Sequence, residues 1–185
     1  VMAYVKEHCA EELAMLNAEV PEIKEIPTIR FHEAKQIMEE KYGHKSKNRY
    51  DLNPDEEVLL CQWAKEEHDS DFVFVTHFPS AKRPFYAKDD PEDPKLALSF
   101  DLLFRGLEIT TGGQRIHDYQ EQMDKLEARK MNAELFESFT MLHKYGMPPH
   151  GGLGIGLERL TMQLLGLNNI REASMFPRDM NRLEP

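Results

Sequence analysis

Apolar side chains in the first third of the chain recur at the three- to four-residue spacing of amphipathic helices. This spacing predicts helices over residues 1–16, 33–41 and 54–68. The third has the clearest start, because Pro54 lies in its first turn and the acids Asp55 and Glu56 face the helix dipole. A polar, basic loop at residues 43–49 separates the second helix from the third, and residues 29–31 form only a short apolar stretch.

The pattern changes period after residue 70, where β-branched and aromatic residues become frequent. Strands are predicted over residues 71–76, 96–104 and 107–111, the last two joined near Arg105-Gly106. Helices are predicted again over residues 119–130, 132–144 and 157–165. Helices, then strands that we expect to pair antiparallel, then helices again predict an α+β fold.

Composition and charge narrow the class of function. The chain has 185 residues with 23 basic and 33 acidic side chains, so its net charge is −10. This acidic balance excludes a protein that binds DNA non-specifically through its phosphates. A nucleic-acid enzyme with a local basic cleft stays possible, and the loop at residues 43–49 either contacts an RNA backbone or is simply solvated. Two cysteines are too few for a disulfide scaffold, and no apolar run predicts a signal peptide or membrane span, so we expect a cytoplasmic protein.

Three glycines alternate at Gly152, Gly154 and Gly156. On a strand they would share one face and leave it bare, so that a flat ring such as a nucleobase could lie on it. A flexible turn is the alternative, and a dinucleotide fingerprint is disfavoured because the spacing is GxGxG with no clean strand before it. Arg159 follows at the start of a helix, where its guanidinium suits a phosphate oxygen unless it forms a surface ion pair.

Two carboxylates stand in or beside the central strands. Asp101 and Glu108 lie in apolar surroundings, where an acid needs a partner or a metal unless it faces solvent. Carboxylate oxygens near a triphosphate are typical Mg²⁺ ligands. Thr111 could add a hydroxyl ligand, although threonine is also simply a good strand former.

Arg115 follows two glycines, which let the backbone turn close to a small ligand. Its guanidinium could clamp a carboxylate with two hydrogen bonds. A structural ion pair with Asp118 or Glu121 is the alternative, and the spacing alone favours that ion pair.

Together these residues resemble a known family. Gly151-Gly152-Leu153-Gly154-Ile155-Gly156-Leu157-Glu158-Arg159 resembles motif 3 of the class II aminoacyl-tRNA synthetases. Three further strings resemble the aspartyl enzymes of archaeal and eukaryotic type. These are Arg83-Pro84-Phe85-Tyr86, the segment from Arg105-Gly106-Leu107-Glu108-Ile109 to Gly113-Gln114-Arg115-Ile116-His117-Asp118, and the ending from Phe176-Pro177-Arg178-Asp179 to Arg182-Leu183-Glu184-Pro185.

The resemblance implies roles for particular residues. Arg159 would hold the γ-phosphate of ATP, with Gly156, Leu157 and Glu158 in the same ATP-contacting stretch. Glu108 would bind both ATP and Mg²⁺. The other residues implied are Asp101 in the metal cluster, Thr111 as a metal or amino-acid contact, and Arg115 as the partner of the side-chain carboxylate of aspartate. For Arg115 this reverses the interpretation from spacing.

The implied reaction has two steps and assigns no side chain as a nucleophile or an acid–base catalyst. The α-carboxylate of aspartate attacks the α-phosphate of ATP, and the aspartyl group is then transferred to tRNA. The implied partners are ATP, L-aspartate and tRNA(Asp), with tRNA(Asn) as a further candidate. No membrane or DNA partner is expected, and the longer parent enzyme is expected to be a homodimer.

Some parts of the family pattern are missing from the sequence. We find no anticodon-binding domain, no motif 1 and no motif 2, so we expect residues 1–185 to be the C-terminal portion of a class II catalytic domain, an antiparallel sheet flanked by helices. Residues 1–70 would be a mainly helical, insertion-like part, and residues 71–185 would carry the sheet and motif 3. Such a piece should be weak or inactive alone. The alternatives are a stand-alone paralogue that makes asparagine from aspartate without tRNA, and a non-catalytic remnant that binds a nucleotide or a partner.

Overall fold

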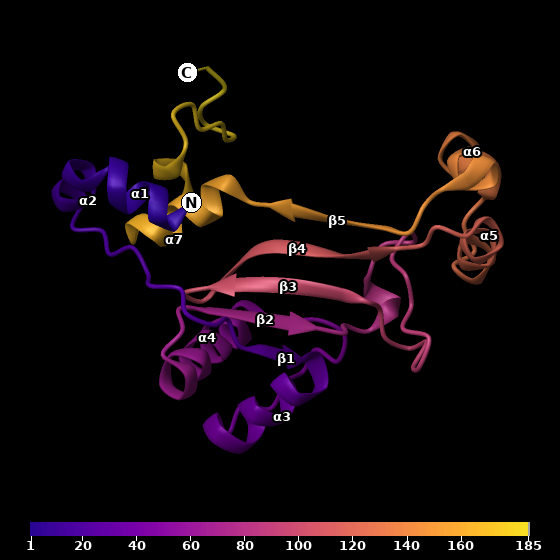
Figure 1. Ribbon diagram of the computed structural model, residues 1–185, viewed down its shortest axis with the longest axis horizontal. Helices are drawn as coiled ribbons and strands as arrows, with labels where there is room; N and C mark the ends of the chain where they lie inside the picture. The colour runs from indigo at the N-terminus through magenta and orange to yellow at the C-terminus, as the bar shows by residue number, and fades with distance from the viewer. Residues whose placement is uncertain (185) are drawn as a thin grey trace.

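A five-stranded sheet in the order β1-β2-β3-β4-β5 lies at the centre of the molecule (Figure 1). The computed structural model describes residues 1–184. The strands are Thr28–Arg30 (β1), Phe72–Thr76 (β2), Ser99–Phe104 (β3), Leu107–Arg115 (β4) and His150–Ile155 (β5). The predicted α+β class is confirmed, with strands of one sheet flanked by helices.

The antiparallel prediction holds for β2 to β5 and is wrong at the β1 edge. β1 pairs with β2 in parallel, with Ile29 opposite Val75. The chain between them passes through two helices, and such a crossover returns the chain to the starting end of the sheet, as a parallel pair requires. No strand was predicted over these residues because β1, only three residues long, is too short to show a strand pattern.

Seven α-helices surround the sheet in the described residues. They are Met2–His8 (α1), Ala10–Leu16 (α2), Phe31–Tyr42 (α3), Pro54–His68 (α4), Tyr119–Ala128 (α5), Glu137–Gly146 (α6) and Leu157–Leu165 (α7). The helices predicted over residues 54–68 and 157–165 are confirmed. The single helix predicted over residues 1–16 is wrong, because Cys9 leaves helical geometry at φ −127° and ψ 33°. Within residues 1–184, no helix has the length and apolar character needed to span a membrane.

Several predicted boundaries shift. β3 begins at Ser99, later than expected, because Ala97 forms an isolated bridge with Asp89. β4 runs on to Arg115 because β5 pairs with it as far as His150. Residues 133–136, predicted as α-helix, form a 3₁₀ turn before α6.

Two hydrophobic clusters support the sheet. The first lies between β1, β2 and the helices α3 and α4, and its members include Phe31, Met38, Leu60, Val75 and Phe78. The second joins the sheet to α7 and α1, and its members include Phe104, Ile109, Leu164, Val5 and Leu160. Figure 1 shows α1, α2 and α7 at one end of the long strands and α5 and α6 at the other. Because β1 belongs to the same sheet as β2 to β5, the first 70 residues share one sheet with the remainder.

Candidate active site

A cavity of about 300 Å³ lies over β4 and β5. Its walls come from these two strands and from the segment that precedes β3. The residues that line it include Arg83, Tyr86, Thr111, Arg115, Gly152 and Gly154. Two of them, Thr111 and Arg115, are residues that the sequence analysis selected for amino-acid binding.

The glycines of β5 leave part of this strand uncovered. A Cβ atom added at Gly154 would meet nothing within 4 Å, whereas one at Gly152 would lie 2.8 Å from a guanidinium nitrogen of Arg115. Gly152 therefore makes room for Arg115, and Gly154 offers open space. Gly156 does not continue the strand, because it is the N-cap of α7 and its amide N–H donates to the Ile109 carbonyl at 2.8 Å.

The guanidinium of Arg115 has no acidic partner among the described residues. It lies over the ring of Tyr86, 4.8 Å from the centroid. Asp118 instead caps α5 by accepting the amide N–H of Glu121 at 2.8 Å, and the Glu121 carboxylate is bound to Lys88 at 2.7 Å. The ion pair favoured from spacing is therefore wrong, and the guanidinium is available to a ligand.

Arg83 is a site residue that the sequence analysis used only as a family marker. Its guanidinium donates to both carboxylate oxygens of Asp101, at 2.8 and 3.1 Å, and to the hydroxyl of Thr111 at 3.1 Å. The Thr111 hydroxyl in turn donates to Asp101 at 2.6 Å. Arg83 also stacks 3.8 Å above the ring of Phe78. Asp101 is thus buried and neutralised, and this arrangement aligns one side of the cavity.

A second group of charges lies at the start of α7. Arg159 donates to the carbonyl of Glu108 at 2.8 Å and approaches its carboxylate to 3.8 Å. Glu57 of α4 accepts the amide N–H of Glu108 at 2.8 Å. Burial raises the pKa of both the Glu57 and the Glu108 carboxyl, and the nearby charge of Asp101 raises the pKa of Glu108 further. The negative charge of this corner is therefore only partly compensated.

Sequence reasoning missed Glu57. Glu57 lies on α4 and contacts Glu108 of β4, which is 51 residues further along the chain. No local sequence pattern links the two residues. The neighbour of Glu57 in the helix, Glu56, is fully buried and is bound to Lys35 instead. The remaining residues predicted for ATP, Leu157 and Glu158, are exposed in the first turn of α7 next to Arg159.

The donor atoms fit Mg²⁺ only when the ion is shared with a substrate. Among residues 1–184, no three His, Cys, Asp or Glu side chains are grouped so that they alone could hold an ion. Mg²⁺ is usually bound by one or two carboxylates together with substrate phosphates. Glu108, only partly compensated by Arg159, provides that kind of incomplete site. Both carboxylate oxygens of Asp101, the other predicted metal ligand, are instead bound by Arg83 and Thr111.

Comparison with known proteins gives one consistent result. Residues 1–180 match the family described as tRNA synthetases class II (D, K and N). The chain is 48% identical to an aspartate–tRNA(Asp/Asn) ligase of Deinococcus radiodurans, covering 100% of this chain and 44% of the relative. It is 39% identical to an aspartate–tRNA(Asp) ligase of Pyrococcus furiosus, covering 98% of this chain and 42% of the relative. The chain thus spans under half the length of these relatives.

Solved structures agree with the sequence relatives. An aspartyl-tRNA synthetase from Entamoeba histolytica superposes with a TM-score of 0.91 at 32% identity, over 100% of this chain and 39% of that one. An asparaginyl-tRNA synthetase from Pyrococcus horikoshii superposes with a TM-score of 0.88 at 33% identity, over 100% of this chain and 44% of that one.

Proposed function

The chain belongs to the class II tRNA synthetases of the aspartate, lysine and asparagine group, and we propose that it carries the ATP and amino-acid sites of an aspartate–tRNA ligase. The observation that carries this proposal is the unpaired guanidinium of Arg115 in a cavity of about 300 Å³. That cavity is of a size for an amino acid. A free guanidinium in a small cavity favours a ligand with a carboxylate side chain, because the pair can form two charge-assisted hydrogen bonds.

The nucleotide would lie beside the amino acid. The open face at Gly154 supports a flat adenine ring on β5. Arg159 would then meet the γ-phosphate, with Gly156, Leu157 and Glu158 flanking it in the same stretch. Glu108 would contact both ATP and Mg²⁺. The ion, when bound, would neutralise the charge of the phosphates.

The protein's own residues would act by position and charge. Arg115 holds the side-chain carboxylate of aspartate, which leaves the α-carboxylate free to attack the α-phosphate of ATP. Pyrophosphate leaves, and aspartyl-adenylate remains in the cavity for transfer of the aspartyl group to the 3′-terminal ribose of tRNA. Arg83 keeps Asp101 and Thr111 aligned on the side of the cavity they share. Such a reaction depends on orientation and on preorganised charges, and no covalent nucleophile is required.

Two tRNA specificities are candidates, namely tRNA(Asp) alone or both tRNA(Asp) and tRNA(Asn). Relatives named as charging both tRNA(Asp) and tRNA(Asn) are 44–49% identical to this chain, whereas those named for tRNA(Asp) alone are 38–42% identical. This difference favours a protein that charges both tRNAs. A cytoplasmic location and a homodimeric parent stay predictions from the resemblance.

The test is amino-acid-dependent exchange of pyrophosphate into ATP. Aspartate, asparagine and lysine are offered separately to this chain and to the longest natural product that contains it. We expect exchange with aspartate alone, and mainly in the longer product. The similarity to an asparaginyl enzyme makes asparagine the sharpest competitor, and exchange with asparagine but not aspartate would overturn the proposal.

A further inference from the structure

The loop at residues 43–49 concentrates positive charge in an acidic chain. It reads Gly-His-Lys-Ser-Lys-Asn-Arg, in a protein of net charge −10. With α3 it borders an open hollow of about 700 Å³, whose lining includes His32, His44, Lys45, Asn48 and Arg49. The active site described above makes no use of these cations.

A buried ion pair holds this basic loop in place. The ammonium of Lys35 donates to the Glu56 carboxylate at 2.7 Å, to the Ser46 hydroxyl at 2.9 Å and to the Asp51 carbonyl at 2.9 Å. The Ser46 hydroxyl donates to the Asn48 carbonyl at 2.9 Å. Glu56 is 0% exposed. Lys35 therefore anchors the backbone of the loop to α3 and α4, and the loop cations project from this anchored backbone.

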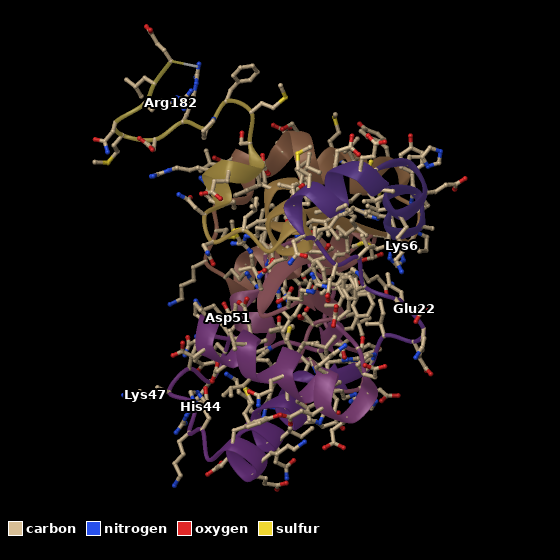
Figure 2. The ribbon with its side chains drawn as sticks, turned by 90° about the vertical axis from the view of Figure 1, so that its left-hand side faces the viewer. Lys6, Glu22, His44, Lys47, Asp51 and Arg182 are labelled. Atoms are coloured by element: carbon tan, nitrogen blue, oxygen red, sulfur yellow. The ribbon has the colours of Figure 1, made fainter. Side chains whose placement is uncertain are left out.

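Two cations of the basic loop are free for a partner. Lys45 approaches Glu39 at 4.0 Å, but Lys47 and Arg49 are exposed and form no ion pair with the described residues. Figure 2 shows Lys47 at the outer edge of the loop, on the opposite side of that view from Lys6. Tyr50 follows Arg49 in the chain and is 52% exposed, so an aromatic side chain is also accessible in this segment. Exposed cations with an aromatic ring are the combination that binds single-stranded nucleic acid.

The basic loop adjoins the phosphate corner of the candidate active site. Glu56 anchors the loop, and the next residue, Glu57, accepts the amide N–H of Glu108 at 2.8 Å. Two residues beyond the loop, the charge of Asp51 is near enough to Glu108 to raise the pKa of Glu108. One turn of α4 therefore joins the loop to the site.

We propose that the basic loop binds the phosphate backbone of the tRNA near its 3′ acceptor end, through Lys47 and Arg49. This inference rests on the proposed function, because the tRNA end must reach the site where the adenylate forms. Two contacts to phosphate give affinity without reading sequence. The loop would thus strengthen binding of any tRNA that the enzyme charges.

The experiment uses the longest natural product that contains this chain. A Lys47→Ala/Arg49→Ala variant is compared with a Lys6→Ala/Lys144→Ala control, which also removes two exposed cations that form no ion pair with the described residues. Filter binding measures the Kd for an unmodified tRNA(Asp) transcript at several salt concentrations. For the loop variant we expect Kd to rise about fivefold or more, and the slope of log K against log salt to fall by about two. The control should bind like the wild type.

Aspartate-dependent pyrophosphate exchange separates this inference from the proposed function. We expect both variants to retain wild-type exchange, since neither touches the cavity. An unchanged tRNA Kd in the loop variant would overturn the inference, as would equal weakening in the control. Loss of exchange in the wild type itself would overturn the proposed function instead.

Discussion

One methyl group added to the bare face of β5 should weaken nucleotide binding without lowering the stability of the protein. A Cβ atom at Gly154 meets no atom within 4 Å, so Gly154→Ala adds a side chain without a clash in the free protein. Glycine within a strand costs about 0.5–1 kcal/mol relative to alanine, because it loses more backbone freedom on folding. The free energy of unfolding should therefore stay unchanged or rise by about that amount.

The same methyl group would occupy the space assigned to the adenine ring. Forcing an extra methyl into a filled contact typically costs about 1–3 kcal/mol. At about 1.4 kcal/mol per tenfold change, this corresponds to a Kd for ATP that is roughly 5- to 150-fold higher. The variant should thus be at least as stable as the wild type and yet bind ATP more weakly.

Calorimetric titration with ATP and urea unfolding of the same preparations measure the two effects. Gly152→Ala is the matched comparison on the same face, since its Cβ atom would press on the guanidinium of Arg115 at 2.8 Å. That variant should impair aspartate binding more than ATP binding. If Gly154→Ala binds ATP as tightly as the wild type while folded, the ring does not lie on this face and the reasoning is refuted.

Three further predictions concern the charges of the cavity. Arg115→Lys should raise the KM for aspartate about 10- to 100-fold while the Kd for ATP changes less than about twofold, because a lysine cannot form the two-pronged hydrogen bond; an unaffected KM in steady-state exchange kinetics would contradict the assigned role. Arg83→Ala should lower the free energy of unfolding by about 3–5 kcal/mol, since it leaves the carboxylate of Asp101, with 7% of its side chain exposed, without its partner. Adding Asp101→Asn should restore much of that loss in urea unfolding, and equal losses in the single and double variants would argue against the pair. Glu57→Gln should raise the free energy of unfolding at neutral pH but not near pH 4, because partial burial raises the pKa of the Glu57 carboxyl. The stability that Glu57 contributes is therefore present below its unfolded pKa and is lost as pH rises through its folded pKa. A pH series of unfolding curves that run parallel for the two proteins would count against this.

The elements predicted best from the sequence are the helices whose ends are set by local capping residues. Residues 54–68 form a helix because Asn53 and Glu56 supply a reciprocal cap and Pro54 begins the first turn. Leu157–Leu165 ends at Gly166, whose φ of 66° favours glycine. No comparable signal marks the break at Cys9, and the three residues of β1 become a strand only because β2 lies beside them.

The sequence predicted which residues belong to the candidate site but not which of them contact one another. Arg115 could be selected from the sequence. Its guanidinium is left without an ion pair to Glu121 because Lys88, 33 residues from Glu121 in the chain, binds that carboxylate. Arg83 reaches Asp101 across 18 residues, from a segment without regular periodicity. Tertiary pairing of this kind carries no trace in local spacing, so only the family resemblance pointed to the role proposed here for Arg115.

The two hydrophobic clusters become complete at different times as the ribosome makes the chain. The first closes once Leu103 is available, but the second joins Met2 and Val5 near the beginning to Leu164 near the end. About 60 further residues separate these points, or roughly 3–12 s of synthesis. During that interval Met2 and Val5 lack the part of the cluster that Leu160 and Leu164 of α7 supply, so this apolar surface stays incompletely covered until α7 has been made.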